Sequence, residues 1–381
     1  MQTLTRANQE LFRRGKDESF PSLTALWDHC FKIRERSTDH WHPPQSVHPH
    51  VEDGELKLAF GGDRPFQFND WSFAQLCRLA SVAKDTLNRL TPQTAARVLD
   101  ETLPTSERPV QILTTGDVIR SIHGVAYSRL WDVDLLTMLR EFATDFQPPQ
   151  RAGIVRSDPA VSDEDIPFEP DPESEPTHGT GLYCGEQDMF CFMIDPTGWT
   201  EINGEAFAPG FFVWNSEVGR RSVGIQTFWF QAVCANHIVW DAVEVVDFSR
   251  KHTANVHEAL SEIRTIVANL VEKRDQRRDG FAKVIKKACE ETLGPTAEEA
   301  MTVLQQQGIT KSLAKQALEI ARQRGRFTIF AVVDALTRLS AKIAHAGDRA
   351  EADEKTGRLL ALASDENRVR NRGRQLAVAG V

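Results

Sequence analysis

The sequence lacks the segments that would place it in a membrane or an oxidising compartment. No apolar run approaches the roughly 20 residues that a membrane-spanning helix needs. The first twenty residues lack the apolar core of a signal peptide. The six cysteines are scattered, and none falls in a Cys-x-x-Cys pair, which is typical of reduced, mostly buried thiols. We therefore expect a cytoplasmic protein that does not associate with a membrane.

The common catalytic signatures are also missing. There is no Gly-x-x-x-x-Gly-Lys-Ser/Thr loop, no Gly-x-Gly-x-x-Gly, no His-Glu-x-x-His and no Gly-x-Ser-x-Gly. No cofactor is predicted. The net charge of −9 disfavours a protein that binds polyanions over its whole surface. It leaves room for a local basic groove, because physiological salt screens charges beyond about 8 Å.

Length and pattern predict an α+β fold of several units. A chain of 381 residues exceeds one typical core. Residues 157–176 hold eight acids, five prolines and no base, which favours a flexible linker or inserted loop. We expect N-terminal helices and a His/Pro-rich loop (1–50), a mixed helix and hairpin unit (51–156), the acidic segment (157–178), a largely antiparallel β unit (179–253), a helical region (254–365) and a basic tail (366–381).

Helical patterns with recognisable caps frame the β unit. Ser22 is a plausible N-cap for the first, and apolar spacing predicts another over 132–142. After residue 252 an apolar stripe predicts one helix from 256 to about 278. Thr296, Thr310 and Thr328 then open three more helices.

The densest apolar and aromatic stretch runs from Pro209 to Thr253. It predicts strands over 210–215, 222–234 and 238–248. Both faces of the second strand are apolar, which is typical of a central strand covered on both sides. Residues 218–221 form the turn between the first two strands, and Gly219 is free to adopt a positive φ there.

This turn and the end of the third strand concentrate positive charge. A guanidinium group presents a planar fork that matches phosphate oxygens, and single strands need cations beside aromatic stacking faces. The residues predicted to contact nucleic acid are Arg220, Arg221, Trp229, Arg250, Lys251 and His252. The alternative is a solvated turn, with the aromatic side chains in the core.

Two weaker patterns point to other chemistry. Asn215, Glu217, His237 and Asp241 supply a carboxamide, carboxylates and an imidazole that could serve acid–base catalysis if they converge. His40, His42, His48 and His50 form two His-x-His pairs that could ligate a metal ion. Their alternative is a Pro-rich loop with incidental histidines.

Several segments together resemble a known family. WNSEVGRRSVGIQTFWFQAVCANHIVWDA followed by FSRKH, and the upstream pieces GLYCGEQDMFCFMID, DWSFAQLCRLASVAKDTLNRLTP and VIRSIHGVAYSRLWDVDLL, are similar to domain of unknown function family 932, the phage/plasmid-related proteins. The similarity covers roughly residues 55–345, and the acidic segment looks like an insertion in it. The resemblance implies a mobile-element context and DNA metabolism. It supplies no catalytic residue.

Three functions from different classes remain open. We favour a non-enzymatic single-stranded nucleic-acid binding or annealing factor, with single-stranded DNA as partner and homo-oligomerisation left open. The alternatives are a metal-assisted hydrolase or nuclease, and a scaffold or adaptor for another mobile-element protein that binds through the C-terminal helices.

Overall fold

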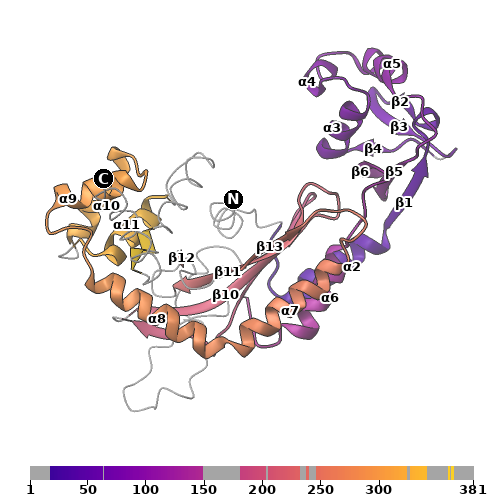
Figure 1. Cartoon of the computed structure of the whole chain (residues 1–381). Coiled ribbons are helices and arrows are strands. Elements are labelled where there is room, and N and C mark those ends of the chain that lie inside the picture. Colours follow the sequence, from indigo (N-terminus) through magenta and orange to yellow (C-terminus); the bar gives the residue numbers. More distant parts are fainter. Residues whose placement is uncertain are drawn as a thin grey trace, which may run out of the picture.

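A computed structural model describes residues 18–62, 64–148, 181–202, 205–231, 237–239, 246–323, 327–340, 359–360 and 362–363. The acidic segment and the basic tail lie outside these residues, as does Asp241. The described elements confirm the α+β fold. Figure 1 shows a curved, elongated chain with an N-terminal unit at one end and the C-terminal helices at the other.

The N-terminal unit is built on a four-stranded sheet in the order β1-β5-β6-β4. The strands are β1 (Ser37–His42), β4 (Gln67–Phe68), β5 (Val110–Thr115) and β6 (Val118–Gly124). A separate hairpin pairs β2 (His48–Glu52) with β3 (Glu55–Ala59), next to a short 3-10 turn, η2 (Pro44–Ser46). Helices α3 (Asp70–Leu79), α4 (Lys84–Leu87) and α5 (Pro92–Thr102) share its core. Because β1 pairs with β5, the His/Pro-rich segment is part of this unit.

The central sheet is antiparallel throughout, as predicted. Its order is β12-β11-β10-β8-β7, with β13 also paired to β11 and β9 to β10. The strands are β7 (Leu182–Cys184), β8 (Met189–Ile194), β9 (Thr200–Ile202), β10 (Glu205–Asn215), β11 (Val223–Gln231), β12 (His237–Val239) and β13 (Asp247–Arg250). The predicted β10–β11 hairpin is confirmed. Of the predicted third strand, 238–248, the described residues include parts of β12 and β13, which pair with opposite ends of β11, whereas residues 240–245 lie outside the described residues.

Both faces of the central hairpin are buried, as the two-sided apolar pattern predicted. Helices α2 (Leu23–Glu35), α6 (Asp132–Phe142) and α7 (Glu258–Glu272) contribute to the core on one face. Phe192, Phe212 and Phe228 form an aromatic cluster on the other face. Since α6 packs here, it belongs to the central core although it precedes the acidic segment.

The C-terminal helices form a third core against the far end of the sheet. They are α8 (Arg274–Glu290), α9 (Ala297–Gln306), α10 (Lys311–Gln323) and α11 (Ile329–Ser340). The single helix predicted to about 278 ends instead at Glu272, and α8 begins two residues later. The Thr296 cap is confirmed, because its hydroxyl accepts from the amide of Glu299 at 3.2 Å. In the part of the chain described, no helix is long and apolar enough to cross a membrane.

Candidate functional site

The turn at 216–221, between β10 and β11, packs against the N-terminal unit and does not project freely into solvent. Gly219 has φ +70°, so the predicted positive φ is confirmed. A Cβ atom at this position would lie 2.6 Å from Cε1 of His123 and 2.7 Å from Cε2 of Tyr127. Glycine is therefore required both by the backbone and by the close contact.

Glu217 holds the turn in place through its side chain and its backbone carbonyl. Its side chain is buried and forms an ion pair with Arg120, which is also buried. Its second carboxylate oxygen accepts from the amide of Asp132 at 3.3 Å. The Glu217 carbonyl accepts from the hydroxyl of Tyr127 at 2.8 Å and from the guanidinium of Arg129. Both the carboxylate and the backbone carbonyl of Glu217 are thus engaged in holding the turn.

Asn215 extends this buried network to α6. Its Nδ2 donates to the carbonyl of Leu130 at 2.9 Å and to the carboxyl of Asp132 at 2.8 Å. Burial, together with the nearby charge of Glu217, raises the pKa of the Asp132 carboxyl well above its ordinary value. Asn215 therefore fixes the end of β10 on the first residue of α6.

Three stacked rings close the side of the turn. His123 lies on Tyr127 with 3.7 Å between ring centroids, and Tyr127 lies 5.5 Å from His252. His123 donates from Nε2 to the carbonyl of Val218 at 2.9 Å, and His252 donates from Nδ1 to the carbonyl of Ser128 at 3.3 Å. His252, predicted to contact nucleic acid, is only 8% exposed, so little of its side chain reaches the surface.

The buried histidines predict a pH dependence of stability. Burial lowers the pKa of both His123 and His252 to about 4, whereas unfolded histidine titrates near about 6.5. Between these values the unfolded chain binds more protons, so this contribution is complete above about pH 6.5 and is lost as the pH falls toward about 4. Within this range, each histidine lowers the free energy of unfolding by up to about 1.4 kcal/mol for each pH unit of acidification.

Urea unfolding of the wild type and of His252→Phe measures this slope. Between about pH 7 and about pH 5 the variant should lose up to about 2 kcal/mol less than the wild type. Phenylalanine keeps the contact with Tyr127, and the comparison cancels the titration of carboxyl groups. Equal slopes in the two proteins would contradict a neutral, buried His252.

Three other residues that were predicted to contact nucleic acid are engaged within the protein. Arg221 forms a largely buried ion pair with Asp188. Arg250 pairs with Glu258 at 2.6 Å and with Glu262. Trp229 is fully buried and stacks on Phe281 of α8, with 3.9 Å between the ring centroids. The two arginines are neutralised locally, and the indole ring belongs to the core.

What remains at the surface is a smaller group, which we call the Trp71 patch: Trp71, Arg78, Arg220 and Lys251. The guanidinium carbons of Arg220 and Arg78 lie 5.4 Å and 5.1 Å from the ring of Trp71. Trp71 is half-buried and donates from Nε1 to the carbonyl of Val218 at 3.0 Å. Both arginines and Lys251 are exposed. None of the three cations forms an ion pair with a described residue.

Strand register brings Lys251 to the same end of the sheet. Val223 pairs with Arg250 in the antiparallel β11–β13 ladder. Beyond this pair, Ser222 precedes Val223 and Lys251 follows Arg250, so Lys251 lies opposite Ser222. Ser222 is two positions from Arg220 in the chain. Sequence analysis identified Arg220 and Lys251 but missed Trp71 and Arg78. The local signal for these two was an aromatic and a cation seven residues apart, in one of the segments that resemble the family.

The histidine pairs do not converge on a metal site. His40 and His42 lie on β1 with ring centroids 6.4 Å apart, and both contact Phe60. His48 and His50 are exposed on β2, in a different sheet. Among the described residues, the group with ligand atoms close enough for a metal ion is Cys30, Asp132 and Cys184. The side chain of His237 and all of Asp241 lie outside the described residues, so the predicted acid–base group stays a prediction.

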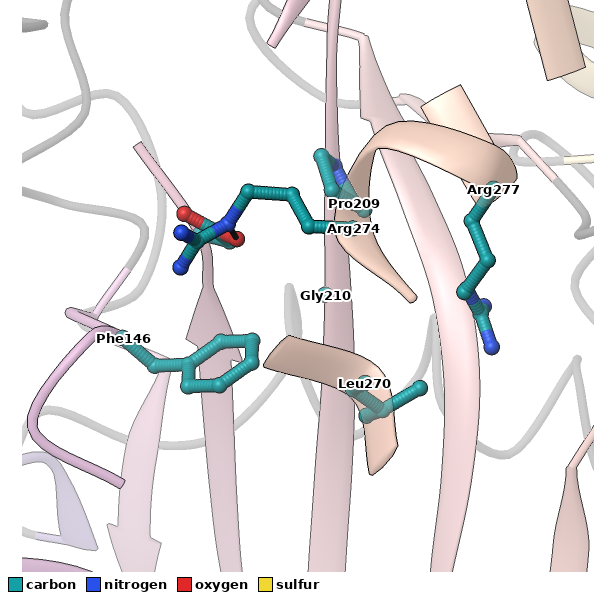
Figure 2. Close-up of a pocket in the computed structure, with 7 residues that line it drawn as sticks. Phe146, Pro209, Gly210, Leu270, Arg274 and Arg277 are labelled. Atoms are coloured by element: carbon teal, nitrogen blue, oxygen red, sulfur yellow. Dashed lines mark hydrogen bonds and ion pairs between the residues drawn. The ribbon is translucent and has the colours of Figure 1, made fainter. Parts of the chain in front are cut away.

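A small pocket lies elsewhere on the central sheet, between β10 and the start of α8. It is lined by Phe146, Asp195, Pro209, Gly210, Leu270, Arg274 and Arg277. Figure 2 shows Arg274 and Arg277 pointing in different directions. Arg274 pairs with Asp195, and with Asp145 at 3.1 Å. The charge of Arg274 is thus neutralised by carboxylates of the protein itself.

Comparison with known proteins found a match, which covers the β-rich and helical part of the chain. Residues 185–361 match the family model described as a domain of unknown function (DUF932). No curated protein and no solved structure matches the chain. The matched segment contains Arg220 and Lys251, whereas Trp71 and Arg78 precede it. The patch is therefore shared between the matched segment and the N-terminal unit.

Proposed function

We propose that this chain, whose residues 185–361 match the DUF932 family model, is a non-enzymatic protein of DNA metabolism that binds single-stranded nucleic acid through the Trp71 patch. The observation that carries the proposal is the placement of two exposed guanidinium groups, Arg220 and Arg78, over one half-buried indole ring. The mobile-element context belongs to the same proposal and is motivated by the resemblance of the sequence motifs.

The chemistry of the patch suits a nucleotide. An arginine that lies over an indole keeps the edge of its guanidinium fork available for phosphate oxygens, while the ring orients it. The exposed part of Trp71 offers a surface on which a base can stack, and stacking is tolerant of sequence. Lys251 adds a third cation at the same end of the sheet.

The buried network beneath the patch supports tight positioning. The backbone of the turn that carries Arg220 is held by Tyr127, Arg129 and His123. A preorganised site loses less conformational entropy on binding than a mobile loop does. The ion pair of Glu217 with Arg120 keeps that carboxylate away from an incoming phosphate.

Loss of Arg220 should weaken binding without affecting the fold. We expect Arg220→Ala to change the free energy of unfolding by less than about 0.5 kcal/mol, because the residue is exposed. The slope of log affinity against log salt should become shallower by about 0.7, which is the value for one phosphate contact on a single strand. The combined replacement of Arg220, Arg78 and Lys251 should reduce it by about 2. Anisotropy of a fluorescent oligonucleotide over a salt series measures both.

Arg97→Ala is the matched control. Its side chain is 82% exposed on α5, and the substitution changes the net charge by the same amount as Arg220→Ala does. It should leave affinity and salt slope unchanged. A triple variant that binds as well as the wild type, or a folded wild type that fails to bind at about 50 mM salt, would rule out the patch as the nucleic-acid site.

A further inference from the structure

A buried group of metal-ligating atoms shares Asp132 with the network that holds the 216–221 turn, and none of its residues belongs to the Trp71 patch. We call Cys30, Asp132 and Cys184 the thiol–carboxylate cluster. Each residue offers one ligand atom, and these atoms all lie within 4.8 Å of one another. All three residues are buried. We infer that this cluster binds one divalent cation of the zinc class, which links the α2 and α6 helices to the central sheet.

The distance between the two sulfur atoms fits a shared metal ion. The Cys30 and Cys184 sulfurs lie 3.8 Å apart. Two zinc–sulfur bonds of about 2.3 Å at a tetrahedral angle place the sulfurs about 3.8 Å from each other. A disulfide would require about 2.05 Å. One oxygen of Asp132 supplies the third ligand, and thiolate with carboxylate is a donor set that zinc accepts.

The three ligands come from three different elements that already pack together. Cys30 lies in α2, Cys184 ends β7, and Asp132 begins α6. Side chains of all three elements share one hydrophobic core. The Asn215 side chain orients the Asp132 carboxyl with a hydrogen bond of 2.8 Å. Supporting hydrogen bonds of this kind are typical of carboxylates that ligate metal ions.

One polar atom beside the cluster lacks a partner. In the described part of the chain, the buried Oδ1 of Asn215, whose Nδ2 donates to the Asp132 carboxyl, has no hydrogen-bond partner. On binding, the two thiols would release their protons to solvent, and the charge of a divalent cation would stabilise the thiolates and the carboxylate.

We assign the cation a structural role because all three ligands are buried, and they fill three of the four positions around a tetrahedral zinc ion. A substrate has no access to ligands that are 5% exposed or less. The cation would instead cross-link residues that are 154 positions apart in the chain. This conclusion differs from the sequence analysis, which predicted no cofactor and named only the four histidines as weak metal candidates.

The test measures metal in the full-length protein after exposure to Zn(II) and removal of excess ions. We expect about one zinc ion per chain in the wild type, and loss of that ion in Cys30→Ser and in Cys184→Ser. Cys191→Ser is the matched control, because Cys191 is fully buried in the same core but is not part of the cluster. It should retain the ion.

Cobalt(II) gives an independent reading on the wild type alone. Thiolate-to-cobalt charge-transfer absorption should appear on titration with Co(II) and disappear when Zn(II) is added. A folded wild type that shows neither bound zinc nor this absorption overturns the inference, even if the serine variants fail to fold. Zinc that persists in both cluster variants, or that is lost equally from Cys191→Ser, also overturns it.

Discussion

Replacement of Glu217 by alanine should lower the free energy of unfolding by about 3–5 kcal/mol. The substitution leaves the buried guanidinium of Arg120 without its carboxylate. It also removes the acceptor of the Asp132 amide, at the first turn of α6. An unpaired charge destabilises the folded state far more when it is buried than when it is exposed. The protein interior offers no interaction that replaces the hydration lost by the charge. Urea unfolding followed by tryptophan fluorescence measures the loss.

Two comparisons separate this effect from a general loss of charge. Glu101→Ala removes the partner of Arg97 in an exposed pair on α5 and should cost less than about 1 kcal/mol. Replacing Arg120 by methionine in the Glu217→Ala background should recover part of the loss, since it removes the stranded charge. If Glu217→Ala unfolds like the Glu101 variant, the network does not anchor the turn.

Replacement of Trp229 by alanine should cost about 3–5 kcal/mol of stability, because it opens a large cavity in the core. The indole ring is fully buried and lies parallel to Phe281, with 6° between the ring planes. The side chain joins β11 to α8, so the loss should separate the sheet from the C-terminal helices. Denaturant unfolding of both proteins gives the difference.

Trp229→Phe sharpens the test. The Trp229 Nε1 has no hydrogen-bond partner among the residues that the structure describes. Phenylalanine keeps a ring against Phe281 and removes this unpaired donor, so it should cost clearly less than alanine. Trp41, which is 48% exposed, is the control, and Trp41→Ala should change stability by less than about 0.5 kcal/mol. Unchanged stability in Trp229→Ala, together with weaker nucleic-acid binding, would show that Trp229 contacts nucleic acid and does not support the core.

Local patterns predicted the central hairpin because its signals lie close together in the chain. The alternation of β11 and the positive φ of Gly219 are properties of short segments. The caps Ser22 and Thr296 were found for the same reason, since each bonds to a backbone amide three residues away. The break between α7 and α8 was missed although the last apolar residue of the predicted stripe, Val271, lies directly before the end of α7 at Glu272.

The site could not be predicted in the same way, since its parts meet only in the folded chain. Trp71 reaches the turn across 147 residues, and no periodicity links them. Arg220 and Arg221 are adjacent and looked equivalent, yet one is exposed and the other reaches Asp188, 33 residues earlier. Side-chain type alone could not assign a partner to either. The two cysteines of the thiol–carboxylate cluster are likewise brought together only by the packing of α2 on β7.

The contacts that hold the 216–221 turn join segments that are far apart in the chain. Arg120, Arg129 and Tyr127 contact Glu217 across 97, 88 and 90 residues, and all three precede the segment that matches the family model. Contacts of such long sequence separation form late, because loop closure must be completed first. The β10–β11 hairpin can form from local contacts, but its tip is immobilised only when the N-terminal unit docks. A chain in which the N-terminal unit has not docked therefore presents Arg220 without the ring of Trp71 that orients it.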